Sequence, residues 1–124
     1  MAKSASDAVL DGLLEIINDC TLMTVCNAEP TTYAEAATTF KLADVVMTAG
    51  TDYTISNGDT NGRKVRVAAK SAVPIDTTGT ATHVALAISA SSTLHFVTTC
   101  TSQALTSGGT VDVPVWDIEV ADPT

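Results

Sequence analysis

Hydrophobic and polar residues alternate along the second half of the chain. From Thr82 to Val120 nearly every second residue is apolar, and most residues between them are Thr, Ser, Asp or Ala. Successive side chains of a strand point to opposite faces of a sheet, so this pattern predicts several half-buried antiparallel strands. We expect a hairpin in which residues 83–89 pair with residues 93–100, and we expect both strands to be central.

The last strand changes its phase. Its apolar positions are first Val111, Val113 and Val115, and then Trp116, Ile118 and Val120. A slip of one residue in the alternation is what a β-bulge or a change of sheet produces. We therefore expect a bend at Val115-Trp116, next to Pro114.

The first twenty residues show the spacing of an amphipathic helix. Ser4 and Asp7 have the spacing of a capping box. Four apolar residues then recur on one helical face: Leu10, Leu13, Leu14 and Ile17. The opposite face is acidic, and like charges at i, i+4 weaken an isolated helix, so packing must hold it. We expect residues 1–20 to form a helical arm that contacts a partner. Deleting the residues before Cys20 should then leave a folded monomer without partner binding.

The rest of the first half alternates short elements. Strands are expected at 21–26 and 41–48, and a short helix at 33–39, where Thr32 and Glu35 repeat the capping-box spacing. A hairpin should join 53–56 to 63–69 through the turn-forming loop 57–62. The predicted fold is a single mainly β domain spanning 1–124, with a sheet core at 21–124. It is a small antiparallel β-sandwich or barrel-like domain with an N-terminal amphipathic helix and one short second helix.

The charge of the chain bears on its partners. The formal net charge is −8 and the isoelectric point is about 4.3, which argues against nucleic acid as a ligand. The acidic residues in the first twenty positions also exclude a membrane-spanning segment there. Two clusters of opposite charge remain: Arg63, Lys64 and Arg66 in one segment, and Asp117 and Glu119 near the C-terminus. They are either solvated faces or complementary contacts between subunits.

The cysteine count is odd. Cys20, Cys26 and Cys100 show no C-x-x-C pair and no zinc-like spacing. Buried free thiols are our first interpretation. The alternative is a disulfide between two of them, or between subunits through the third, if the protein meets an oxidising medium.

Two features resemble metal sites only in part. The loop 57–62 opens like a calcium loop, but Ala68 stands where the closing bidentate Glu should be. His83 and His95 could share a sheet face, yet no recognisable metal motif accompanies them. Catalytic and nucleotide-binding motifs are not found in the sequence. We therefore expect no cofactor, no metal and no enzymatic activity.

Four segments carry a resemblance to a known family. They read PTTYAEA at 30–36, NGRKVRVAAKS at 61–71, ATHVAL at 81–86 and VTTCTSQALTSGGTVDVPVWDIEVADP at 97–123. Together they cover most of the chain, and the C-terminal segment is the strongest of them. They resemble a family of small virion proteins from tailed bacteriophages.

The resemblance implies a structural protein made in the host cytoplasm and placed on the capsid surface of the virion. Its most specific implication is a head decoration, or cement, protein that binds the major capsid protein. Copies of the chain would form a symmetric oligomer such as a trimer, and many weak contacts would add through avidity. A neck or tail location, a carbohydrate- or receptor-binding module and an undetected hydrolase are the alternatives.

Overall fold

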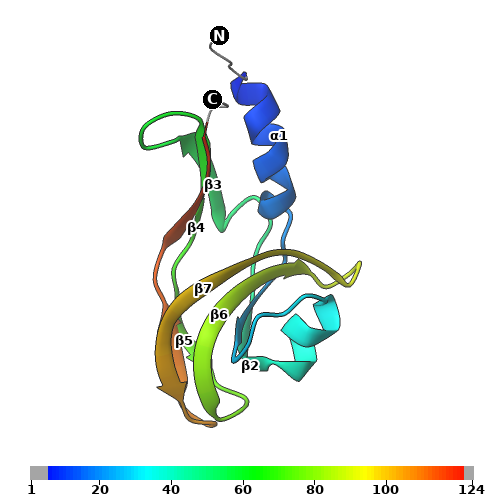
Figure 1. Ribbon diagram of the computed structural model, residues 1–124, viewed down its shortest axis with the longest axis vertical. Coiled ribbons are helices and arrows are strands. Elements are labelled where there is room, and N and C mark those ends of the chain that lie inside the picture. The colour runs from blue at the N-terminus through cyan, green and yellow to red at the C-terminus, as the bar shows by residue number, and fades with distance from the viewer. Residues whose placement is uncertain (1–5, 122–124) are drawn as a thin grey trace.

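The computed structural model describes residues 6–121 and is mainly β (Figure 1). The elements are α1 (Asp7–Asn18), β1 (Leu22–Cys26), η1 (Glu35–Thr39), β2 (Lys41–Val46), β3 (Tyr53–Asn57), β4 (Arg63–Val67), β5 (Lys70–Pro74), β6 (Gly79–Ile88), β7 (Thr93–Leu105), β8 (Thr110–Val113) and β9 (Trp116–Val120). The predicted fold class, an antiparallel β structure with an N-terminal helix and a short second helix, is confirmed.

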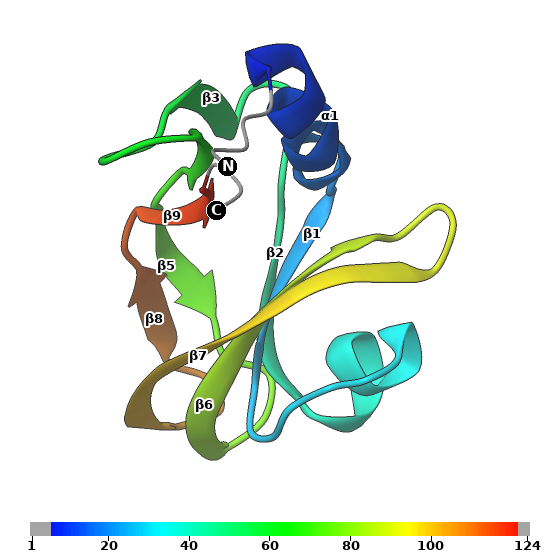
Figure 2. The ribbon, with the colours of Figure 1, turned by 45° about the horizontal axis from the view of Figure 1, so that its top comes forward.

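The strands form three antiparallel sheets. Their strand orders are β2-β1-β6-β7, β3-β4-β9 and β5-β8. The expected hairpin is formed by β6 and β7, and Leu86 faces Phe96 across it. Our expectation that both strands are central is wrong for β7, which is an edge strand, because β1 supplies the second neighbour of β6 (Figure 2).

The predicted bend separates β8 from β9. β8 pairs with β5, and Val111 lies opposite Val73. After Pro114 and Val115, β9 pairs with β4, and Ile118 lies opposite Val65. The one-residue slip in the apolar pattern therefore marks a change of sheet, since the two strands present their apolar side chains from different sheets.

One hydrophobic core lies between the large sheet and the two smaller sheets. The large sheet contributes Met23, Val25, Val84 and Leu86. The smaller sheets contribute Val65, Val67, Val73, Val113 and Ile118. Alternation places these side chains on the inner faces, so the architecture is sandwich-like.

Helix α1 packs on this core and is not a separate arm. Its N-cap is Ser6, whose hydroxyl accepts a hydrogen bond from the Val9 N–H, whereas Ser4 lies outside the described residues. The helix packs against β3 and β4. Leu14 and Ile17 belong to the core cluster, so our expectation that residues before Cys20 can be deleted without unfolding is wrong.

The short second helix begins with the predicted capping residues. The Thr32 hydroxyl accepts from the Glu35 N–H at 3.2 Å, and the Glu35 carboxylate accepts from the Thr31 hydroxyl at 2.7 Å. Ala36 is fully buried, and its carbonyl accepts from the Cys26 thiol. The segment thus covers one face of β1 and β2.

Candidate protein-interaction surfaces

The predicted charged clusters pair with each other on the outer face of β4 and β9. Register places Arg66 opposite Asp117 and Lys64 opposite Glu119. Arg66 Nε lies 2.9 Å from Asp117 Oδ1, and Lys64 Nζ lies 3.6 Å from Asp117 Oδ2. The hydrogen bonds from Arg66 lower the pKa of Asp117. A carboxylate held in this way stays ionised.

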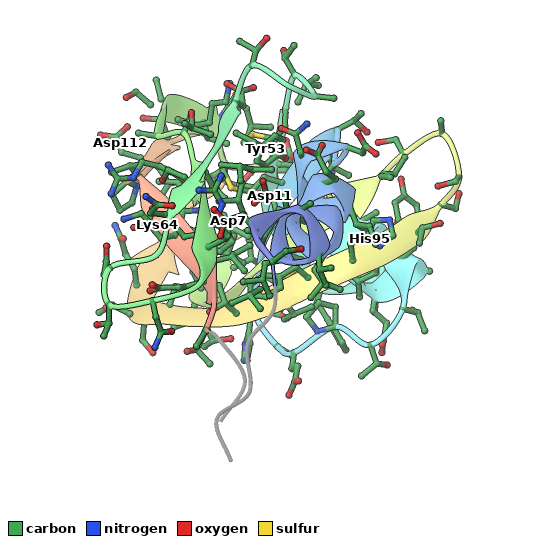
Figure 3. All side chains as sticks on the ribbon, turned by 90° about the horizontal axis from the view of Figure 1, so that it is seen from above. Asp7, Asp11, Tyr53, Lys64, His95 and Asp112 are labelled. Atoms are coloured by element: carbon green, nitrogen blue, oxygen red, sulfur yellow. The ribbon has the colours of Figure 1, made fainter. Side chains whose placement is uncertain are left out.

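The remaining members of the clusters also have partners in the same chain. Arg63 Nε donates to Asp11 Oδ1 at 2.7 Å, which joins α1 to β4. Glu119 Oε1 accepts from the Asp59 N–H at 2.6 Å. Figure 3 shows Asp11 on the side of α1 that faces Lys64. The structure thus pairs both clusters within one molecule, in place of the contact between subunits that we considered.

Helix α1 divides the four residues predicted to contact a partner. Leu10, Leu14 and Ile17 are buried inside the chain and are not free to contact another molecule. Leu13 is 56% exposed. Val9 and Ile16 are exposed as well, and together these three residues form what we call the outer stripe. Sequence reasoning missed Val9 and Ile16, although their i, i+4 and i+7 spacing with Leu13 was available as a signal.

The outer stripe exists because the apolar part of α1 is wider than the surface that covers it. At about 100° per residue, the apolar arc from Gly12 to Leu14 spans about 200° of the helix circumference. The core covers the half that contains Leu10, Leu14 and Ile17. The stripe lies on the flank opposite to Asp11, so its large side chains remain in solvent.

The three cysteines are free thiols. Cys20 and Cys26 are buried, and Cys100 is half-buried. Strand β6 lies between the strands of Cys26 and Cys100. Two strand spacings amount to about 9.5 Å, which exceeds the Cα separation of a disulfide. Burial raises the pKa of Cys20 to about 11 and also raises the pKa values of Cys26 and Cys100.

The two histidines lie at different positions along β7. His83 faces Thr99, and its Nδ1 lies 2.8 Å from the Thr82 hydroxyl. His95 is four residues further along β7, or about 13 Å away. Among residues 6–121, no group of three or more His, Cys, Asp or Glu side chains could hold a metal ion. In the loop 57–62, the Asp59 carboxylate accepts from Lys64 Nζ at 2.6 Å.

A groove that sequence reasoning missed lies between β7 and the β8–β9 segment. It consists of two cavities of about 270 and 290 Å³ that share four lining residues: Val84, Cys100, Val113 and Pro114. The first cavity extends along Thr101, Gln103 and Val111, and the second extends to Thr98 and Trp116. We call the two together the seam groove. Figure 2 shows how the chain leaves β7 and returns through β8 and β9 to form its second wall.

Trp116 forms one end of the seam groove. Its ring centroid lies 5.9 Å from that of Phe96, so the two rings bridge β7 and β9. The Trp116 Nε1 atom is buried and has no hydrogen-bond partner in the described part of the chain. A buried N–H group without an acceptor is uncommon in folded proteins and needs an explanation.

Comparisons with protein-family models, with curated proteins and with solved structures found no match to this chain. Within residues 6–121, the helices are too short and too polar to cross a bilayer. The interpretation of function therefore depends on the surfaces described above and on the resemblance in the sequence.

Proposed function

We propose that the protein is a non-enzymatic structural component of a tailed-bacteriophage virion that decorates and stabilises the capsid by binding major capsid protein subunits. The observation that carries the proposal is the outer stripe of α1. Three large apolar side chains at helical spacing are typical of a helix that packs into an apolar groove of a second protein. The resemblance of the four sequence segments supplies the identity of that second protein.

The charge of α1 supports a partner different from the chain itself. All charged residues of the helix and its C-cap are acidic: Asp7, Asp11, Glu15 and Asp19. Two copies that met through α1 would bring like charges together, which costs free energy. A capsid subunit with an apolar groove and a basic rim would complement the helix. On a symmetric shell, many such contacts would add through avidity even if each were weak.

The test is reconstitution on particles that lack this protein. Purified wild-type chain and a Leu13→Glu variant would be added to such heads, and the bound copies counted by electron microscopy. We expect Leu13→Glu to reduce the affinity about tenfold or more, because the new carboxylate must be buried against apolar surface. Ala8→Glu is the matched control, since Ala8 is exposed on the same helix outside the stripe.

Two outcomes would contradict the proposal. Equal occupancy of the two variants would exclude the outer stripe as the contact. Wild-type protein found only at the neck or tail would keep a virion role but reject capsid decoration.

A further inference from the structure

We infer that the seam groove binds an extended segment of a second, different polypeptide, with two apolar side chains two residues apart and a Lys or Arg beside them. This inference goes beyond the proposed function, because it concerns a site on the opposite wall of the fold from α1's contacts with β3 and β4. It would hold whether or not the partner belongs to a capsid. Four observations support it.

The shape of the groove fits an extended chain. Its two cavities adjoin through Cys100 and Val113. In a strand, residues i and i+2 point to the same side and lie about 6.6 Å apart. Two side chains of such a segment would therefore enter the two neighbouring cavities, while a helical segment would place its neighbouring side chains at i and i+3 or i+4.

The walls of the groove offer unpaired backbone. β7 is the last strand of the large sheet, β9 is the last strand of its three-stranded sheet, and β8 has β5 as its only strand partner. The lining residues come from all three strands and from Pro114. An added strand gains main-chain hydrogen bonds at such edges, and the pockets for alternate side chains give specificity.

Trp116 supplies a donor at the end of the groove. Its indole N–H is buried and unpartnered in the described residues, although the ring lines the second cavity. A backbone carbonyl of an entering segment would give this N–H its acceptor. The cost of the unpartnered N–H in the free protein would then be recovered on binding.

Charge selects the occupant. The charged residues among the lining side chains are Asp112 and Asp117 alone. Asp112 Oδ1 already accepts from the Ala72 N–H at 2.8 Å, and Asp117 is paired with Arg66. Both nevertheless keep the groove electronegative, and the chain carries a net charge of −8. A basic segment of another protein is therefore favoured over a second copy of this chain.

The experiment selects ligands from a random nine-residue peptide library displayed on yeast, with the full chain as bait. We expect enriched peptides to carry two aliphatic residues at i and i+2 and a neighbouring Lys or Arg. The affinity of the best synthetic peptide would then be measured by fluorescence, since Trp116 is the single tryptophan of the chain. Saturable binding should shift its emission.

Matched variants locate the binding site. Thr101 and Ser102 are neighbours on β7 and both are exposed, but only Thr101 lines the groove. Thr101→Lys should weaken the basic peptide about tenfold, and Ser102→Lys should leave its affinity unchanged. Cys100→Phe should abolish binding by filling both cavities, provided that circular dichroism shows a folded protein. If Cys100→Phe does not fold, the Thr101 and Ser102 pair decides.

Several results would overturn the inference. They are no enrichment over empty bait, enrichment of acidic peptides, apolar residues at i and i+4 only, or equal affinity in the Thr101→Lys and Ser102→Lys variants. A wild-type dimer that Cys100→Phe converts to monomer would show that a second copy occupies the groove, against the basic partner inferred here.

Discussion

The outer face of β4 and β9 and the outer stripe of α1 are both exposed surfaces, and they differ in what the chain provides for them. On the β4–β9 face, antiparallel register brings Arg66 to Asp117 and Lys64 to Glu119. On α1, Val9, Leu13 and Ile16 have no cover. Charged residues that lie far apart in sequence can find partners across a sheet, but an apolar side chain gains nothing from water. The uncovered apolar surface is thus the better indicator of an interaction site.

The largest effect should separate the two faces of α1. Leu14 is 1% exposed and Leu13 is 56% exposed. Leu14→Ala should reduce the free energy of unfolding by about 2–5 kcal/mol, because it leaves a cavity in the core. Leu13→Ala should change it by about 0.5 kcal/mol or less. Urea unfolding followed by circular dichroism measures both. Equal losses would show that the outer stripe is covered within the free protein.

An intermediate test concerns the seam groove, the second surface that the chain leaves unsatisfied. Trp116→Phe removes the unpartnered N–H together with part of the ring. Recovery of the cost of a buried donor, about 1–3 kcal/mol, offsets the lost contacts, so the unfolding free energy should change by about 1 kcal/mol or less. Phe96→Leu, which loses the ring contact with no such recovery, should be more destabilising. The opposite order, measured by the same urea method, would show that the indole N–H is satisfied in the free protein.

The smallest effect should come from the paired charges. The hydrogen bonds from Arg66, and the positive charges of Arg66 and Lys64, lower the pKa of Asp117 below its ordinary value of 3.8 against the opposing effect of burial. A carboxyl with a lowered pKa stabilises the fold fully above its ordinary pKa. This contribution is lost as the pH falls from about 4 through the lower pKa of the folded state. Wild-type protein should therefore lose more stability in this acid range than Asp117→Asn.

Thermal unfolding in a series of buffers between about pH 6 and about pH 2 would measure the difference. Leu13→Ala is the control, because the outer stripe has no titratable group and should keep the wild-type pH dependence. Parallel curves for wild type and Asp117→Asn would mean that the pairing on the β4–β9 face does not contribute to folding.

Local patterns were sufficient for most of the secondary structure. The alternation in β6, the turn residues around 57–62 and the Thr32–Glu35 spacing all predicted elements that the structure contains. The expectation of a central β7 was wrong because alternation describes the two faces of a strand but says nothing about its two edges. The helical arm was misassigned because an apolar helical face reads the same whether its own chain or a partner covers it.

The amino-acid sequence determined by itself that this chain is mainly β, where its helices lie and where its last strand changes sheets, because periodic burial is encoded in near neighbours. Only the tertiary structure decided which acid meets which base, which half of α1 is covered and where an apolar groove opens. Those outcomes depend on strand order, which brings together residues such as Arg66 and Asp117, 51 positions apart. Contacts of that range are set by how the whole core packs and leave no local signal.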